Sequence, residues 1–434
     1  MVDLVVGHIE GLRGEPPIRT GTPAELDALL REPPPEAPGD VDAALDLLAG
    51  EVLTRMQHGD HPRFFARVPS PSNGVSALGD ALAAGFNAFA GSWAGGSGPA
   101  ALELVVLDWL RELCGLAPGT EGILVSGGSV AALTALAAAR HESPGDVAYV
   151  SDQTHASNTR ALRILGVPHI RVLPSDDGFR LPPAALRAAL ADDRAAGLTP
   201  FCVIATAGTT NTGAVDPLGE LADLCAGEGL WLHVDGAYGA PAALTGRGRA
   251  LLAGAERADS LSLDPHKWLF QPYEAGCLLV RRPGALQRTF AMAPEYLRDV
   301  LGDEVNFRDR GPQLSRGARA IKLWLSFKAF GVAAIRAGIE RGMELAERAE
   351  AALEAARGWE IVTPAQLAIV TFRAEGGDAV NAALTQRAVA DGYAAPSSTV
   401  LRGRTVLRLC TINPRTTDAE IDETVARLSS LRAG

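Results

Sequence analysis

Continuous apolar runs alternate with helix-like segments through the middle of the chain, from about residue 95 to about residue 290. The runs include "GILVSGG", "PFCVIATAG" and "LWLHVDGA", and helical patterns such as "SVAALTALAAARH" separate them. Strands that are apolar along their whole length are typical of a parallel sheet that helices cover on both faces. Seven such runs predict an α/β fold with a mainly parallel seven-stranded sheet. Ligands of such sheets bind beyond the carboxyl ends of the strands.

The two ends of the chain carry different patterns. Residues 1–94 hold short amphipathic segments joined by proline-rich stretches such as "REPPPEAPGD", which cannot be helical. Helices this short bury little surface alone, so we expect the N-terminal helical segment to pack on another domain or subunit. After a long helical stretch, shorter strand-like runs and helices alternate, which predicts a small C-terminal α+β domain over residues 346–434. The large α/β domain then covers residues 95–345.

Composition narrows the class of protein. The 434 residues are 47% hydrophobic and 21% charged, as expected of a globular protein with a large core. The net charge of -11 argues against nucleic acid or an anionic membrane as the main partner. We find no membrane-spanning run and no signal peptide in the sequence. The five cysteines show no C-x₂₋₄-C spacing, which predicts no metal site, buried free thiols and a reducing, cytoplasmic location.

A glycine-rich turn follows the first expected strand of the sheet. In "VSGGSVAAL", the strand runs into Gly127, Gly128 and Ser129, and a helix then begins. Such a turn directs free backbone N–H groups, a hydroxyl and a helix N-terminus toward one point, which suits a phosphate. The motif is neither a Walker loop nor G-x-G-x-x-G, and an ordinary tight turn is an equally good interpretation.

Three further polar residues follow strand-like runs, and each has an ordinary explanation when taken alone. His155, in "SDQTHASNT", could be structural. Asp235, in "LWLHVDGAYGA", needs a cation or several donors if it is buried, or could cap a helix. Lys267, in "SLSLDPHKWLF", could be a surface charge, whereas apolar surroundings would lower its proton affinity and make it a nucleophile toward aldehydes.

Together the four features form a set that one cofactor needs. They supply a phosphate cradle, an aromatic ring that can stack, a buried carboxylate and an enclosed amine. Pyridoxal 5'-phosphate (PLP) forms a bond from its aldehyde to a lysine, and its pyridine nitrogen needs a carboxylate to stay protonated. The combination therefore indicates a PLP enzyme.

The chain resembles the group II PLP-dependent amino-acid decarboxylases, the family of aromatic-L-amino-acid, histidine and glutamate decarboxylases. "DPHKW" matches the family's lysine motif, "HVDGAYG" its aspartate motif and "SDQTHAS" its histidine motif. The separation of 32 residues between Asp235 and Lys267 is also that of the family. The likeness extends from "DLVVGHIEGLRG" to "VLRLCTINPRTT", nearly the whole chain. It implies fold type I, PLP as cofactor, and a homodimer with shared active sites.

The resemblance implies a role for each matching position. Lys267 would bind the cofactor covalently, Asp235 would pair with the pyridinium nitrogen, and His155 would stack on the ring and orient the substrate carboxylate. These three are the predicted catalytic residues. The remaining predicted cofactor-binding residues are Gly128, Ser129, Thr210, Ala237, Asp264 and His266. The predicted substrate-side residues are Arg67, Val68, Pro69 and Ser70, then Phe89 and Gly91 from the partner subunit, and Phe307.

The implied reaction is decarboxylation of an L-amino acid to an amine and CO₂. Ungapped alignment from Lys322 puts Phe307 where many eukaryotic relatives have a mobile-loop tyrosine that helps to protonate the product. Relatives with that replacement can release an aldehyde, so decarboxylation-dependent oxidative deamination is an alternative. A differently built loop with another proton donor, such as His155 or water, is the interpretation we favour. Aminotransfer is a further alternative, against which "DPHKW" and His155 argue.

Two substrate-side positions bear on which amino acid is used. Gly91 stands where aromatic-specific relatives often have a bulky ring, which would enlarge the pocket. Arg67 replaces an aromatic residue and would favour an acidic group if it points inward, or would simply face solvent. We predict an aromatic L-amino acid as the substrate.

Overall fold

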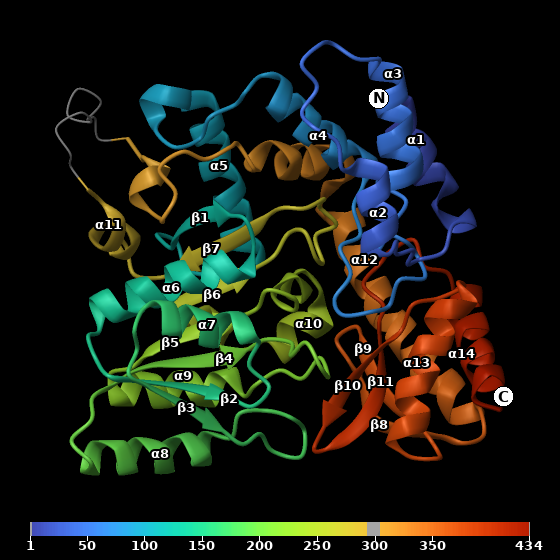
Figure 1. Ribbon diagram of the computed structural model, residues 1–434. Coiled ribbons are helices and arrows are strands. Elements are labelled where there is room, and N and C mark those ends of the chain that lie inside the picture. The colour runs from blue at the N-terminus through green and yellow to red at the C-terminus, as the bar shows by residue number, and fades with distance from the viewer. Residues whose placement is uncertain (1, 293–303, 434) are drawn as a thin grey trace.

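A seven-stranded sheet forms the centre of the molecule in the computed structural model, which describes residues 2–292 and 304–433 (Figure 1). The strand order is β1-β7-β6-β5-β4-β2-β3. Strand β7 runs antiparallel to both of its neighbours, and all other neighbouring strands are parallel. The strands are β1 (Glu121–Val125), β2 (Val147–Ser151), β3 (His169–Leu173), β4 (Pro200–Thr206), β5 (Trp231–Asp235), β6 (Ser260–Leu263) and β7 (Gly276–Val280). The predicted fold class is confirmed.

The burial of these strands explains their composition. Every residue of β2, β5, β6 and β7 is buried, which is why these segments are apolar rather than alternating. The few polar residues in β5 and β6 are buried too, and Asp235 is the last residue of β5. A carboxylate at that place lies at the carboxyl edge of the sheet, where the site was expected.

Helices cover both faces of the sheet. Crossovers between parallel strands are right-handed, so the direction in which the chain moves along the sheet decides which face a helix covers. Helices α6 and α7 lead the chain toward β3 and lie on one face. Helices α8 and α9 lead it back toward β1 and lie on the other face. The helices of this region are α5 (Trp93–Leu113), α6 (Gly128–Glu142), α7 (Ala156–Ile164), α8 (Pro183–Ala195), α9 (Leu218–Glu228), α10 (Gly246–Leu251) and α11 (Ala285–Phe290). All five cysteines are buried free thiols, as predicted.

A second, smaller sheet lies at the C-terminal end. Its four antiparallel strands, in the order β10-β11-β9-β8, pack with two helices, which matches the predicted small α+β domain. The long helix α12 (Ala320–Ala355) connects the two sheets, so the predicted boundary after residue 345 falls inside a helix, and the domain limits stay a prediction. The elements are β8 (Trp359–Gln366), β9 (Ile369–Ala374), α13 (Asp378–Asp391), β10 (Ser397–Leu401), β11 (Arg404–Cys410) and α14 (Asp418–Ala433).

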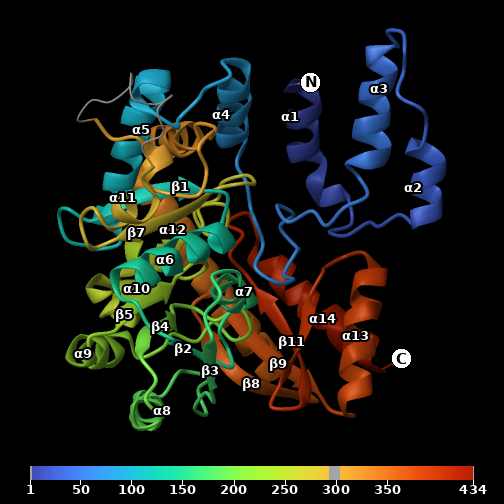
Figure 2. The same cartoon turned by 60° about the vertical axis from the view of Figure 1, so that its left-hand side comes forward.

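The N-terminal segment consists of short helices, as its pattern predicts. Figure 2 shows α1 (Val2–Gly11), α2 (Pro23–Leu30) and α3 (Val41–Leu47) at one corner of the molecule. None of the three contains a buried residue, whereas α4 (Gly74–Gly85) packs on α12. Among the helices of residues 2–292 and 304–433, none is long and apolar enough to cross a membrane.

Candidate active site

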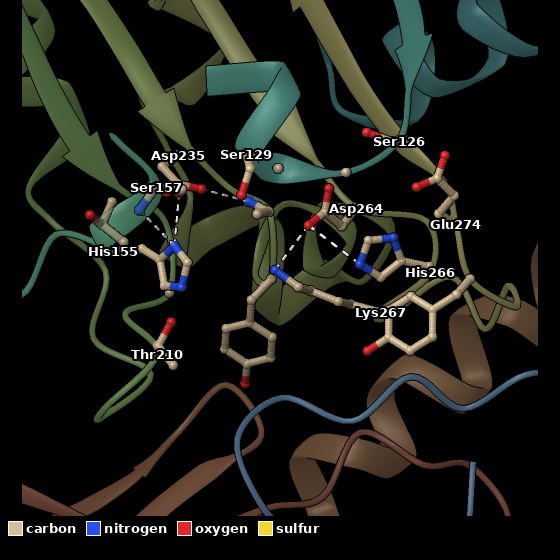
Figure 3. A pocket seen from close by; sticks show the side chains of 17 residues that line it. Ser126, Ser129, His155, Ser157, Thr210, Asp235, Asp264, His266, Lys267 and Glu274 are labelled. Carbon is tan, nitrogen blue, oxygen red and sulfur yellow. Dashed lines mark hydrogen bonds and ion pairs between the residues drawn. The ribbon is translucent and has the colours of Figure 1, made fainter. Parts of the chain in front are cut away.

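A cavity of about 410 Å³ lies beyond the carboxyl ends of the sheet strands (Figure 3). All nine residues predicted to hold the cofactor line it. In the view of Figure 3, His155 and Asp235 lie on one side, Asp264 and His266 on the other, and Lys267 between them. The fold therefore brings together side chains that span more than a hundred positions of the sequence.

The glycine-rich turn lies at the N-terminus of α6. A Cβ on Gly128 would lie 2.9 Å from Oδ2 of Asp264 and 3.2 Å from Cβ of Ala237, so only glycine fits there without displacing its neighbours. The hydroxyl of Ser129 and the first N–H groups of α6, which lack partners within the helix, are available to an anion at this point. This end of the cavity can hold a phosphate.

Lys267 is paired inside the cavity. Its Nζ lies 2.9 Å from Oδ2 of Asp264, and Nε2 of His266 lies 3.7 Å from the same oxygen. Burial lowers the pKa of Lys267, but the charge of Asp264 and its hydrogen bond outweigh burial and leave the pKa above its usual value. From the sequence, apolar surroundings would lower the proton affinity of this amine, and in the structure the neighbouring carboxylate of Asp264 outweighs that effect.

Asp235 is 7% exposed and accepts three hydrogen bonds. The amide of Ala237 donates to its Oδ1 over 3.1 Å and Oγ of Ser262 over 3.4 Å, while Nδ2 of Asn158 donates to its Oδ2 over 2.6 Å. Burial raises the pKa of Asp235, but His233, Lys267 and these donors together bring it below the usual value. The predicted need for several donors is met, and the site contains a charged carboxylate.

His155 occupies the N-cap position of α7. The amide of Ser157 donates to Nδ1 of His155 over 3.3 Å, and Oγ of Ser157 lies 2.7 Å from the same nitrogen. Burial lowers the pKa of His155, so the ring is neutral at pH 7. Since Nδ1 accepts a hydrogen bond, the ring proton lies on Nε2, which is free to donate to a ligand.

The residues predicted on the substrate side, unlike the predicted cofactor-binding residues, lie outside the cavity. None of the seven lines this cavity within the described parts of one chain. Arg67 is exposed, and its backbone is held by Arg408, which donates to its carbonyl oxygen over 2.6 Å. Ser70 comes nearest to the site, because its Oγ donates to the carbonyl oxygen of His266 over 2.5 Å.

Gly91 and Phe307 are packed inside the protein. A Cβ on Gly91 would lie 2.4 Å from the ring of Phe89, so the glycine makes room for that ring within its own chain. Phe307 is fully buried, and the guanidinium carbons of Arg316 and Arg310 lie 5.0 and 5.8 Å from its ring centroid. Neither position contacts the cavity of its own chain.

Several lining residues were not anticipated from the sequence. Tyr273 stacks at a tilt on His266, with ring centroids 4.9 Å apart, and Glu274 receives a hydrogen bond of 2.9 Å from Arg319. Their position shortly after the lysine motif is the one signal that could have indicated them. Asn158, which does not line the cavity but donates to Asp235, lies inside the quoted histidine motif, yet no spacing rule links it to Asp235.

The side chains present fit PLP. A helix N-terminus suits its phosphate, an amine can bond to its aldehyde, and a charged carboxylate can pair with its ring nitrogen. Oδ1 of Asp264 is buried and has no hydrogen-bond partner among the described residues, so this oxygen is available to accept a hydrogen bond from a ligand.

Comparison with known proteins agrees with the geometry. Residues 23–375 match the pyridoxal-dependent decarboxylase conserved domain. The aromatic-L-amino-acid decarboxylase of Bacillus atrophaeus is 46% identical over 448 aligned residues, which cover 99% of this chain and 93% of that protein. The crystal structure of Oryza sativa TDC with PLP and tryptamine superposes with a TM-score of 0.95 at 29% identity, and that of Rhodiola rosea 4-hydroxyphenylacetaldehyde synthase with 0.92 at 28%; both alignments cover 100% of this chain and 96% of the other. The chain belongs to the pyridoxal-dependent decarboxylase family and is a PLP-dependent carboxy-lyase of amino acids.

Proposed function

We propose that this decarboxylase acts on an aromatic L-amino acid and releases the corresponding amine and CO₂. The observation that carries the proposal is the 46% identity, over 99% of the chain, to the aromatic-L-amino-acid decarboxylase of Bacillus atrophaeus. The test is to supply tryptophan, tyrosine, phenylalanine, histidine and glutamate separately to the holoenzyme and to quantify CO₂ and amine by mass spectrometry. We expect kcat/KM for one aromatic substrate to exceed those for histidine and glutamate by about tenfold or more, and the reverse order would refute the proposal.

In this proposal Lys267 and the turn before α6 hold the two ends of the cofactor. Bound PLP supplies an aldehyde that bonds to an amine and a cationic ring that draws electrons from the bond between Cα and the carboxylate. Lys267 presents the amine, and Asp264, 2.9 Å away, is placed to take its proton. Gly128 and Ser129 bind the phosphate at the N-terminus of α6, with His266 beside them.

Asp235 and His155 act on the ring and on the substrate. The negative charge of Asp235 keeps the ring nitrogen protonated, which maintains its pull on electrons. His155 lines the cavity, where it would stack on the ring and donate a hydrogen bond from Nε2 to the substrate carboxylate. Thr210 and Ala237 complete the walls of the cavity around the ring.

We further propose that the protein is a homodimer with shared active sites. Large apolar side chains are exposed along the first 86 residues, and in a single chain nothing covers them within the described structure. They are Val2, Leu4, Val5, Val6, Leu29, Leu30, Val41, Leu48, Leu53, Met56, Leu78, Leu82 and Phe86. Apolar surface of this extent is typical of protein interfaces. The segment of Phe89 and Gly91, which does not line its own cavity, would then lie near the partner's site.

Release of an aldehyde is the second candidate outcome. It is favoured by one observation, that residue 307 is phenylalanine and has no hydroxyl to donate a proton. In that outcome one O₂ and one water are consumed for each aldehyde, CO₂, ammonia and hydrogen peroxide released. Recording oxygen uptake and peroxide in the substrate panel separates the two outcomes.

We also propose a cytoplasmic location. The five cysteines are all buried and unpaired, which suits a reducing compartment. Fractionation of cells that produce the protein, followed by immunodetection, tests this proposal, and recovery with secreted proteins would contradict it.

A further inference from the structure

Asn158 joins the two residues that face the cofactor ring. It lies in the first turn of α7, three residues after His155, and is fully buried. Its Nδ2 donates to Oδ2 of Asp235 over 2.6 Å, and the same nitrogen lies 3.5 Å from the carbonyl oxygen of His155. The strong contact of this amide is therefore the one to Asp235.

Hydrogen-bond donors are the direct contacts that favour the charged form of Asp235, while His233 and Lys267 lower its pKa from beyond ion-pair distance. Among residues 2–292 and 304–433, no lysine, arginine or histidine lies within 4.0 Å of its carboxylate oxygens to form an ion pair. His233 is neutral at pH 7, because burial lowers its pKa to about 4. Within the described parts of the chain, Oδ1 has two donors, at 3.1 and 3.4 Å, whereas Oδ2 receives only the shorter bond from Asn158. A buried carboxylate oxygen without a donor is costly, so Oδ2 relies on this one amide.

The side-chain carbonyl oxygen of Asn158 does not contribute a hydrogen bond to the fold within the described residues. Its Oδ1 is buried and has no hydrogen-bond partner among the described residues. An orphaned buried acceptor costs free energy, and a leucine of similar volume would avoid that cost. We therefore explain the asparagine at this position by its hydrogen bond to Asp235 rather than by a contribution to packing.

We propose that Asn158 is a positioning residue, whose amide holds Asp235 charged and correctly oriented and thereby sets the affinity for PLP and the protonation of its ring nitrogen. The proposal depends on the role proposed above for Asp235. Asn158 does not line the cavity, so it acts through the carboxylate.

The first test replaces the amide with an apolar group of similar size in the holoenzyme. For Asn158→Leu we expect the dissociation constant of PLP, measured by equilibrium dialysis, to rise roughly 10- to 100-fold, the effect of losing one hydrogen bond to a charge. With PLP labelled with ¹⁵N in its ring, the nitrogen resonance should move toward that of unprotonated pyridine. The matched control is Asn381→Leu, which removes an equally buried amide that bonds to the backbone of Ala374 and Gly377 in the small domain. We expect this control to change neither quantity.

A double-mutant cycle separates this inference from the proposed function. In an Asp235→Asn background, Asn158→Leu should change the dissociation constant less than about twofold, because the carboxylate through which it acts is gone. If Asp235→Asn alone weakens binding and shifts the resonance but Asn158→Leu does neither, the inference about Asn158 is overturned and the role of Asp235 stands. If Asp235→Asn itself changes neither quantity, the proposed role of Asp235 fails, and the inference fails with it.

Asn158→Asp gives a second readout that does not depend on packing. Two carboxyl groups at hydrogen-bond distance share a proton at low pH, and the protonated group then donates as the amide does. As pH rises from about 5.5 to 8.5 the shared proton is lost, and the two negative charges repel. We expect the ratio of the PLP dissociation constants of variant and wild type to grow with pH. His155, His233 and Lys267, the other titratable groups near Asp235, are common to both proteins, so their titration cancels in the ratio. A ratio that stays constant across this range would overturn the proposal.

Discussion

Lys267 and Asp264 form an ion pair inside the cavity, with Nζ of the lysine 2.9 Å from Oδ2 of the aspartate. The lysine side chain is 23% exposed and the aspartate side chain 2%, so water screens the pair weakly. The pair holds the amine in place and favours its protonated form. The same aspartate is then the nearest acceptor for the proton that the amine must lose in order to react.

Replacing Lys267 with alanine should remove the covalent link to the cofactor. We expect Lys267→Ala to lack the visible absorbance of the wild-type holoenzyme and to lose decarboxylase activity, because no other lysine lines the cavity among the described residues. Absorbance spectra and mass spectrometry after borohydride reduction provide the check. The same change at Lys328, which lies over the ring of Trp324, is the control and should keep both properties. A reduced adduct on the Lys267→Ala chain would contradict the assignment.

Removing the charge of Asp264 should shift the reactivity of Lys267 to lower pH. The folded pKa of Lys267 lies above its usual value, so the pair stabilises the cofactor-free fold below the usual lysine pKa, and this contribution is lost as pH rises through the folded pKa. In Asp264→Asn the charge that raises the pKa of the amine most is lost, and burial, which lowers the pKa, is opposed only by the weaker effects of Asp235 and Tyr273. We expect the midpoint of the pH–rate profile for PLP attachment, followed by absorbance, to move down. The variant should also be less stable than wild type at pH 7, and an unmoved midpoint would show that Asp264 does not control the amine.

The main residues of the site could be predicted because each follows a buried strand. Asp235 ends β5, Lys267 comes soon after β6, and Gly128 follows β1, so the carboxyl edge of a parallel sheet brings them together. Asn158 and Ser262 could not be found in this way. They reach Asp235 across 77 and 27 positions of the chain, and no local spacing reports such a contact.

The substrate side was less predictable for a different physical reason. Arg67, Phe89 and Gly91 lie on segments outside the central sheet, whose places depend on packing between distant parts of the chain and, in our proposal, on a second subunit. The ion pair of Lys267 with Asp264 was not predicted, because apolar neighbours in the sequence do not reveal which carboxylate lies beside the amine in space. Sequence patterns therefore located this site, while its electrostatics required the structure.

The buried ion pair of Glu103 and Arg316 should be important for stability. Both side chains have zero exposure, and each of two guanidinium nitrogens lies 2.7 Å from a different carboxylate oxygen. Arg316 also donates to the carbonyl oxygen of Ala90, which precedes Gly91. Breaking such a pair leaves an uncompensated buried charge, so Glu103→Gln should lower the free energy of unfolding by about 3–5 kcal/mol in urea titrations.

The control for that prediction is an exposed pair. Glu423 and Arg427 have side-chain exposures of 46% and 43%, so Glu423→Gln should change the free energy of unfolding by less than about 1 kcal/mol. Equal effects of the two substitutions would show that the buried pair contributes no more than a surface pair.

An acidic residue in the exposed apolar surface should dissociate the proposed homodimer. Phe86 is 80% exposed at the end of α4, and Phe86→Asp would place a charge in the proposed interface. We expect sedimentation to report a monomer and the activity to fall, since in our proposal the partner subunit completes the site. The control is Val172→Asp in the edge strand β3, where the valine is 58% exposed. Dimers that persist in Phe86→Asp would exclude this surface as the interface.

Phe307→Tyr tests whether this position affects the product. The phenylalanine ring is fully buried beside Arg316 and Arg310 and does not line the cavity of its own chain. A hydroxyl added there stays in the core, so we expect the ratio of amine to aldehyde to remain as in wild type, with a loss of stability of about 1–3 kcal/mol from the crowded polar group. Product analysis by mass spectrometry with oxygen uptake measures the ratio, and Phe327→Tyr, at another buried ring on α12, controls for the added hydroxyl. A rise in the amine fraction in Phe307→Tyr alone would show that this segment leaves the core during turnover and delivers a proton to the product.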